Sequence, residues 1–171
     1  RLTNDEYDAT VKALLGIETK PSAAFNQDVR QSGYARNETQ VVDAILAGQY
    51  HEAAKALAME AVANHYSHIV PCDTKDEECG YEFIDYLGER AYRGAFDDDR
   101  RDAIADVFRA GASEGDFDLG VELAIAAVLQ SPYFLYHIEI GEGPDETGRV
   151  LLSQREVANS IAYLVTGAPP D

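Results

Sequence analysis

Apolar side chains recur every three or four residues over most of this 171-residue chain, and no stretch sustains the alternation of a half-buried strand. An α-helix places residues of this spacing along one face, so the chain is restricted to helices that pack through their apolar faces. The pattern predicts an all-α fold, an irregular bundle of about six helices with a long loop after the first. The expected helices cover residues 4–15, 39–65, 80–93, 98–112, 117–130 and 153–165.

Local signals mark several helix boundaries. Thr3 with Glu6, and Ser153 with Glu156, each have the spacing of a capping box, in which two side chains bond the free amides of a first helical turn. Ser131-Pro132 predicts a hinge or a helix restart, because proline disrupts a continuing helix.

The chain opens directly on the first of these helices, with no initiator methionine. We therefore expect that it was cut from a longer precursor and that any leader was removed.

Acidic residues outnumber basic residues by 31 to 14, which gives a formal net charge of −17. This charge repels phosphate backbones and anionic lipids, so nucleic acid is not expected as a partner. It is typical of a soluble secreted or surface protein, and attraction of a basic partner or of Ca²⁺ is the alternative. No apolar run reaches the roughly 20 residues of a membrane-spanning helix, so no membrane span is expected.

Two cysteines, Cys72 and Cys79, lie seven positions apart in a charged, turn-forming segment between two expected helices. This context favours a disulfide, which would stabilise the chain by roughly 2–3 kcal/mol on the chain-entropy model. Two free thiols or a metal site are the alternatives, although zinc sites use a shorter cysteine spacing and need further ligands. A disulfide implies an oxidising compartment, so we expect a periplasmic, cell-surface or secreted protein.

Four groups of residues resemble, in the same order, segments of one protein family. They are Arg1-Leu2-Thr3 with Glu6-Tyr7, Arg90-Ala91-Tyr92-Arg93, Ser131-Pro132 with Phe134-Leu135-Tyr136, and the segment from Tyr163 to Gly167-Ala168-Pro169-Pro170-Asp171. The chain thereby resembles the planctomycete and myxobacterial surface-domain proteins, whose uncharacterised helical modules are often fused to c-type cytochrome modules. The resemblance implies a first module over residues 1–70, a second over 71–139, and the beginning of a third over 140–171.

The resemblance also implies that the polypeptide continues beyond Asp171, so the expected partners are the remainder of that polypeptide or a second chain, and a c-type cytochrome. Haem c would be held by the associated modules or the partner, because this chain has no C-x-x-C-H segment. Four positions depart from the family pattern: Gly94-Ala95 replace Arg-Pro, His137 replaces Arg, and Thr166 replaces Trp. Any family role of these positions is therefore in doubt.

The histidines are the candidate ligands of a metal ion or a non-covalent haem. His65 and His68 share a face if the long helix persists, and two surface histidines near a helix end also act as polar caps. His51 is a further candidate haem ligand. His137 lies among aromatic residues close to Glu139, which suits either a tuned acid or base or a hydrogen-bonded core histidine.

Two acidic segments invite a calcium interpretation, one with Asp97 and Asp99 and the other with Asp73 and Glu77. Neither follows the EF-hand pattern, because a basic residue stands where a further ligand is needed. Acids at a helix start, which interact with the helix dipole, are the simpler interpretation of Asp97 and Asp99.

Three functions are compatible with these observations, and no catalytic residue is assigned. The first is a non-catalytic scaffold and docking portion of an extracytoplasmic multi-module protein associated with c-type cytochrome and electron transfer, which rests on the resemblance. The second is a structural or adhesive cell-surface module without a redox role. The third is part of an enzyme whose site is completed by another chain.

Overall fold

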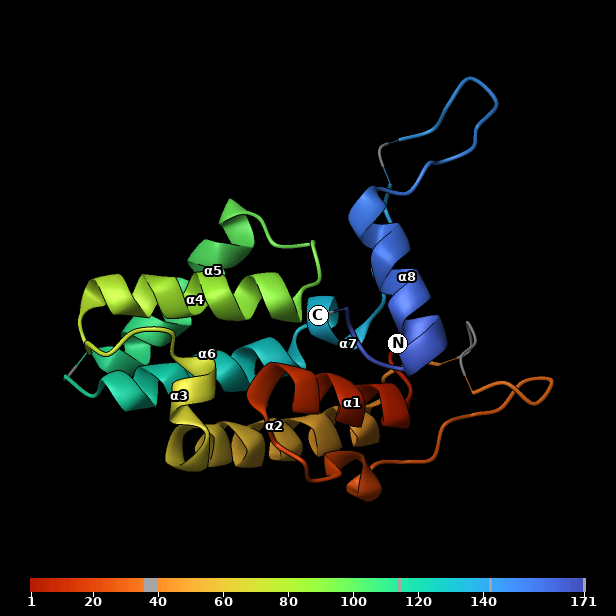
Figure 1. Cartoon of the computed structure of the whole chain (residues 1–171). Helices are drawn as coiled ribbons and strands as arrows, with labels where there is room; N and C mark the ends of the chain where they lie inside the picture. Colours follow the sequence, from red (N-terminus) through yellow and green to blue (C-terminus); the bar gives the residue numbers. More distant parts are fainter. Residues whose placement is uncertain (36–39, 114, 142, 171) are drawn as a thin grey trace.

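A computed structural model describes residues 1–35, 40–113, 115–141 and 143–170, and the regular structure in these ranges is helical. The helices of the described chain, drawn in Figure 1, are α1 (Asn4–Leu15), the 3-10 helix η1 (Pro21–Ala24), α2 (Ala44–Asn64), α3 (Tyr66–Ile69), α4 (Glu77–Ala91), α5 (Asp98–Ala112), α6 (Phe117–Gln130), α7 (Pro132–Leu135) and α8 (Gln154–Thr166). The all-α prediction is confirmed. In the ranges given above, no helix is both long and apolar enough to cross a lipid bilayer.

Side chains cap the first turns of the main helices. Both expected capping boxes form: Thr3 accepts the amide of Glu6 at 3.2 Å, and Glu6 accepts the amide of Thr3 at 2.8 Å. The corresponding distances between Ser153 and Glu156 are 3.3 Å and 2.7 Å. The remaining caps are aspartates, whose short carboxylates reach amides of the first turn; they are Asp43, Asp76, Asp97 and Asp116.

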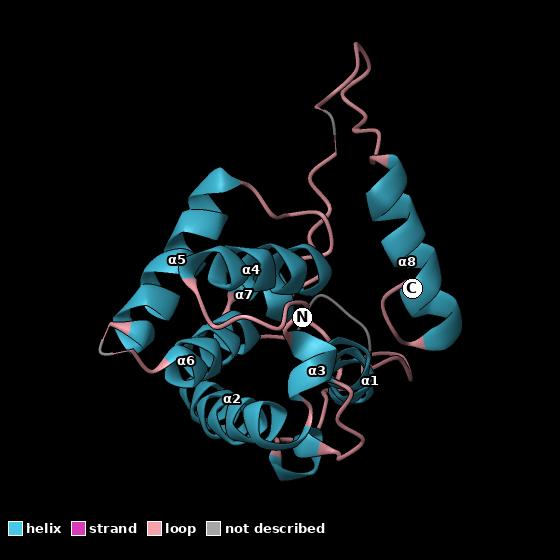
Figure 2. Cartoon of the chain, turned by 60° about the vertical axis from the view of Figure 1, so that its left-hand side comes forward, coloured by secondary structure: helices cyan, strands magenta, loops and turns pink. Residues whose placement is uncertain are grey.

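Helix α6 lies at the centre of the bundle. It packs closely against α2 on one side and α5 on the other, with α4 alongside, as Figure 1 and Figure 2 show. Five apolar side chains form its fully buried face: Val121, Ala124, Ile125, Val128 and Leu129. Full burial of an aliphatic side chain of the size of Val, Leu or Ile contributes about 1.5–3 kcal/mol, so this face is a major source of stability.

A cluster of aromatic rings joins the first helix to three other segments. The Tyr7 ring centroid lies 5.1 Å from that of Phe25, 5.4 Å from that of Tyr50 and 5.7 Å from that of Phe134. These rings come from the loop after α1, from α2 and from α7. Such pairs add about 0.5–1.5 kcal/mol beyond the burial of their area, and they fix α1 against the bundle.

The structure corrects the expected boundary of the long helix. The expected start at Thr39 lies outside the described residues, residues 40–43 are not helical, and α2 begins at Ala44. The reason is that the Asp43 carboxylate accepts a hydrogen bond of 2.8 Å from the amide of Leu46. Asp43 is therefore the N-cap, and the helix begins directly after it. Ile45, although apolar, is 65% exposed, because the buried face of α2 runs through Leu46 and Tyr50.

The expectation of six helices is also corrected, because the described residues contain eight α-helices and the 3-10 helix η1. The additional α3, α7 and η1 have four residues each, too few to show a helical period in the sequence. Ser131-Pro132 is a helix restart: Ser131 caps α7 and Pro132 is its first residue.

Glycines permit the close approach of α5 and α6. A Cβ atom at Gly111 would lie 2.8 Å from both the Cα and the nitrogen of Gly120, which is closer than real Cβ atoms come to backbone. The neighbouring atoms belong to the facing helix and cannot rotate away. Gly48 of α2 differs, because a Cβ atom there would meet nothing within 4 Å.

The first prediction compares Gly111→Ala with Gly48→Ala. Gly111→Ala should lower the free energy of unfolding by about 1–3 kcal/mol, the usual cost of overpacking. Gly48→Ala should raise it by up to about 1 kcal/mol, because alanine is the better helix former and the site is open. Urea unfolding followed by circular dichroism measures both changes, and equal effects of the two substitutions would contradict the close contact of α5 with α6.

Candidate functional site

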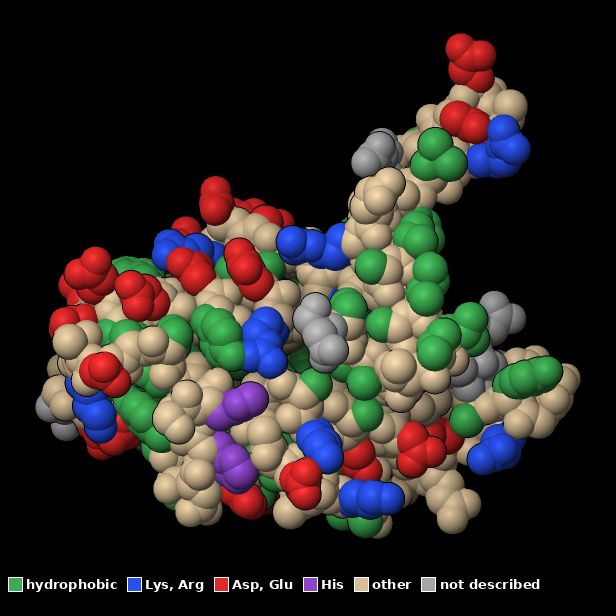
Figure 3. Space-filling model, viewed as in Figure 1, with side chains coloured by type: hydrophobic (Ala, Val, Ile, Leu, Met, Phe, Trp, Pro, Cys, Tyr) green, Lys and Arg blue, Asp and Glu red, His purple; other side chains and the backbone are tan. Residues whose placement is uncertain are grey.

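Helix α8 lies beside the bundle rather than within it, as Figure 2 shows. All thirteen of its residues are described, and Tyr163 alone among them is buried. The hydrophobic side chains along α8 are consequently visible at the surface in Figure 3. This helix is therefore a candidate surface for binding another protein segment.

Four apolar residues form the α8 stripe: Val157, Ile161, Leu164 and Val165. Their exposed fractions are 42%, 56%, 77% and 75%, and their spacing of four, three and one places them on one side of the helix. No charged residue occurs from Val157 to Thr166, in a chain whose net charge is −17. An exposed apolar row without charges is the surface expected of a helix that docks against another protein segment.

Tyr163 anchors α8 to the bundle from the opposite side of the helix. Its hydroxyl lies 2.8 Å from Thr10 Oγ1 of α1, and its ring meets the His137 ring edge-on, with the centroids 4.6 Å apart. Burial raises the pKa of the Tyr163 hydroxyl, and the nearby Arg93 charge offsets part of that rise. The hydroxyl therefore stays protonated and able to donate its hydrogen bond at neutral pH.

Arg93 binds the backbone of α7 and of the residue that follows it. Its Nη2 donates to the backbone oxygens of Tyr133 at 3.2 Å, Phe134 at 2.8 Å and Tyr136 at 2.8 Å. The Arg93 carbonyl in turn accepts a bond of 2.7 Å from the side chain of Asn159 on α8. Burial lowers the pKa of the guanidinium, while Tyr163 and Glu6 favour its charged form.

The structure places His137 beside an acid that sequence proximity does not reveal. Its Nε2 lies 3.6 Å from Glu6 Oε2 of α1, and both side chains are largely buried. Glu139, its neighbour in sequence, instead accepts a hydrogen bond from Ser160 on α8. Glu6 is also part of the α1 capping box, so its carboxylate serves helix α1 and the surroundings of His137 together. His137 thus lies between α1 and α8, in contact with Glu6 of the first and Tyr163 of the second.

Of the other candidate histidines, His65 and His68 lie together and His51 lies apart from them. The rings of His65 and His68 lie over Gly16, and His65 Nε2 is 4.0 Å from Glu60 Oε1. His51 Nδ1 lies 2.9 Å from Gln130 Oε1, far along α2 from the other two. In the described ranges, no three His, Cys, Asp or Glu side chains gather closely enough to hold a metal ion.

The candidate calcium ligands lie in two separate places, at the start of α5 and around the start of α4. Asp97 caps α5 and pairs with Arg100, which is the helix-start role of the simpler interpretation, and Asp99 is exposed in the same turn. Asp73 lies exposed in the loop before α4, and Glu77 begins that helix.

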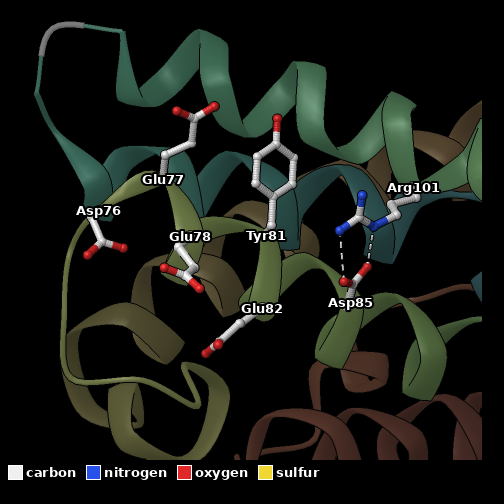
Figure 4. A pocket seen from close by; sticks show the side chains of 7 residues that line it. All are labelled: Asp76, Glu77, Glu78, Tyr81, Glu82, Asp85 and Arg101. Atoms are coloured by element: carbon white, nitrogen blue, oxygen red, sulfur yellow. Dashed lines mark hydrogen bonds and ion pairs between the residues drawn. The ribbon is translucent and has the colours of Figure 1, made fainter.

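Glu77 lines an open acidic pocket of about 680 Å³ on α4, shown in Figure 4. The carboxylate of Glu77 points away from those of Asp76 and Glu82 in that view, so these oxygens do not surround one point. Arg101, the one cation among the described residues that line the pocket, is already paired with Asp85 through an Nη2–Oδ2 bond of 2.9 Å.

The expected disulfide between Cys72 and Cys79 is present, with the Cα atoms 5.8 Å apart. Cys79 lies buried in the first turn of α4, next to the N-cap Asp76. The bridge thus ties the loop that follows α3 to the start of α4, and it closes a short loop whose unfolded state it restricts.

Comparison with protein families gives two matches. Residues 1–63 match the family model described as PSD3, a protein of unknown function (DUF1587), and residues 79–139 match the model described as PSD5, a protein of unknown function (DUF1595). Neither model alone covers half of the chain. In the structure the two matched segments share one core, because α2 of the first packs against α6 of the second.

No curated protein and no solved structure matches the chain significantly.

Sequence reasoning found helix α8 and its caps but missed its role as a surface. The α8 stripe has the ordinary period of a helix that packs on a core, and nothing in the sequence states whether that core belongs to the same bundle. Arg93 and Tyr163 were part of the family resemblance, yet the contacts of Tyr163 with Thr10 of α1 and with Arg93 join residues far apart in the chain. The signal that could have found them is a pair of large polar residues in otherwise apolar surroundings.

The second prediction concerns the attachment of α8 through Tyr163. Tyr163→Ala should release α8, so that the amides of residues 157–166 exchange with solvent faster while the amides of α6 keep their protection. Leu164→Ala, on the exposed side of the same helix, is the control and should leave both sets unchanged. Hydrogen exchange measured by NMR distinguishes the variants, and equal acceleration in α6 would mean that α8 belongs to the cooperative core.

The third prediction concerns Glu156, whose carboxylate accepts the amides of Gly141 at 3.0 Å, Ser153 at 2.7 Å and Ile140 at 2.7 Å. These bonds hold its pKa at about 2. An unfolded chain has a glutamate pKa of about 4.3. The stabilisation is therefore present above about pH 4.3 and lost as the pH falls through about 2. A ¹³C titration of the Glu156 carboxyl should show the low midpoint, whereas a midpoint near that of the unfolded chain would show that the bonds are absent in solution.

Proposed function

We propose that this chain is a non-catalytic helical scaffold and docking portion of an extracytoplasmic multi-module protein associated with c-type cytochrome and electron transfer. Its docking surface is the α8 stripe, and the occupant is the remainder of its own polypeptide or a second chain. The single observation that carries the proposal is that a capped, amphipathic helix exposes its apolar row to solvent.

Energetics support a docking role for this row. Covering an exposed aliphatic side chain of this size contributes up to about 1.5–3 kcal/mol, and α8 offers four such side chains on one side. Because the row carries no charge, a partner would not have to desolvate a carboxylate or an ammonium group there. The acidic side chains gather mainly over the α4 and α5 end of the face drawn in Figure 3, away from α8.

The attachment of α8 supports the proposal as well, because it presents a helix that is already formed. Ser153 and Glu156 close its first turn, and Gly167, in the left-handed conformation with φ 69°, ends it. A partner that binds this helix does not have to order it, so less free energy is lost on association. The polar contacts of Tyr163 and Asn159 orient the stripe outward.

The remaining elements of the proposal rest on the disulfide and on the resemblance. A disulfide is typical of proteins in oxidising compartments, which supports a periplasmic, surface or secreted location. The matched family models carry no functional description, so the link to c-type cytochrome and the division into modules at residues 70 and 139 are supported by the resemblance of the sequence motifs.

The fourth prediction tests the stripe in the natural assembly. The substitutions Ile161→Lys and Leu164→Lys together should disrupt the contact between this segment and its neighbour, because two ammonium groups would be buried in an apolar interface. Met59→Lys, at a similarly exposed apolar position on α2, is the matched control. Limited proteolysis of the full-length natural protein should cut the double variant within residues 140–153 and spare the control; unchanged resistance of the double variant would count against docking through α8.

An optical spectrum of the purified natural assembly tests the cytochrome association separately. A Soret band is expected from haem in the associated modules or partner. Its absence from the intact assembly would leave a structural or adhesive module without a redox role.

A further inference from the structure

A cleft borders the side of α8 that faces the bundle. This cleft of about 420 Å³ lies between α1, the end of α4, α8 and the segment that follows α8. Among the described residues, three arginines line it, namely Arg90, Arg93 and Arg155, and Glu89 is the one acid. The chain as a whole has 31 acidic and 14 basic residues, whereas basic residues outnumber acidic ones in the described lining of this cleft.

Two of these guanidinium groups have donors to spare. Arg155 makes no hydrogen bond or ion pair with the residues that the structure describes, although the chain is rich in carboxylates. Its side chain packs against Gly94, in the turn between α4 and α5. Arg93 uses Nη2 for backbone oxygens, while its Nη1 is buried and lacks a hydrogen-bond partner among the described residues. A buried donor without a partner carries a free-energy cost that a bound acceptor would remove.

The third arginine is held in place by the protein itself. Arg90 Nη2 donates to the backbone oxygen of Ala13 at 2.7 Å, and its guanidinium lies over the Tyr86 ring. Arg90 thus links α4 to α1 and adds fixed positive charge at the rim of the cleft. A site with one anchored cation and two cations that have unused donors is suited to an anion with two oxygens.

Apolar groups complete the lining and restrict the ligand further. Ala13 and Leu14 of α1 form one wall, and Pro169 and Pro170 form another. Inorganic phosphate has no apolar surface that could pack against these walls. A carboxylate on a short carbon skeleton satisfies the arginines and the apolar walls together.

We infer that this arginine cleft binds a small organic carboxylate, held by Arg155 and Arg93 and packed on Leu14 and the two prolines. A ligand in the cleft touches α1, α4 and α8 at once, so it bridges the outlying helix to the bundle. The site is independent of whatever covers the α8 stripe, which faces the opposite direction. Bound carboxylate therefore stiffens the attachment of α8.

The fifth prediction uses succinate as the probe, with inorganic phosphate at equal ionic strength for comparison. In NMR titrations up to about 20 mM ligand, a weak site of millimolar affinity is readily detected. Succinate should shift the signals of the Arg155 guanidinium and the Leu14 methyl groups, and it should slow hydrogen exchange in α8. Arg155→Gln should weaken binding about tenfold, the loss expected for one charge-assisted hydrogen bond.

Lys55→Gln is the matched control, because it removes the same charge from an exposed position on α2. Binding that is weakened by Arg155→Gln and unaffected by Lys55→Gln supports the inference. Absence of shifts with succinate, equal weakening by both substitutions, or phosphate binding as tight as that of succinate would each overturn it. Arg155 is exposed, so its substitution should leave the helical circular dichroism spectrum unchanged.

Discussion

The burial of one face of α6 between α2 and α5 is the contact on which the rest of the structure depends. Because Gly111 and Gly120 let the backbones of α5 and α6 approach closely, the side chains of both helices reach the same core as α2 and α4. The two segments that match different family models are joined through this contact, so neither could keep its buried face without the other. The aromatic cluster around Tyr7 then fixes α1 and α7 at the end of α6.

Helix α8 depends on a different kind of interaction. It contributes Tyr163 to the interior and is otherwise held by polar bonds from Ser160 and Asn159, and by Glu156 at its start. Each such bond adds about 0.5–1.5 kcal/mol, less than a buried aliphatic face provides. Elements attached in this way occupy the low end of the range of local stabilities, from which binding surfaces are commonly drawn. Weak attachment and an exposed apolar row are thus both consistent with the proposed docking role of α8.

Much of the fold followed from the helical period, whereas little of the candidate site did. The bounds of α1, α5 and α6 agree with the sequence pattern because each has a capping side chain directly before a regular apolar face. The start of α2 was misplaced because Asp43, which lies inside the expected helix, caps its first turn and so sets its N-terminal boundary. The contact of His137 with Glu6 joins residues 131 positions apart, and the helical period carries no information on such pairs. The same limit applies to the α8 stripe, since amphipathic spacing shows that a face is apolar and not what covers it.

The distribution of charge connects the exposed row with the arginine cleft. A net charge of −17 keeps copies of the chain apart and opposes the approach of anions from most directions. Helix α8 is the exception on both of its sides: its outer side carries an uncharged apolar row, and its inner side borders the cleft with three arginines and one glutamate. Association through the outer side meets no desolvated charge, while an anion on the inner side meets donors that the protein leaves unused. If both proposals hold, recognition is concentrated on α8, a helix that contributes one buried side chain to the core.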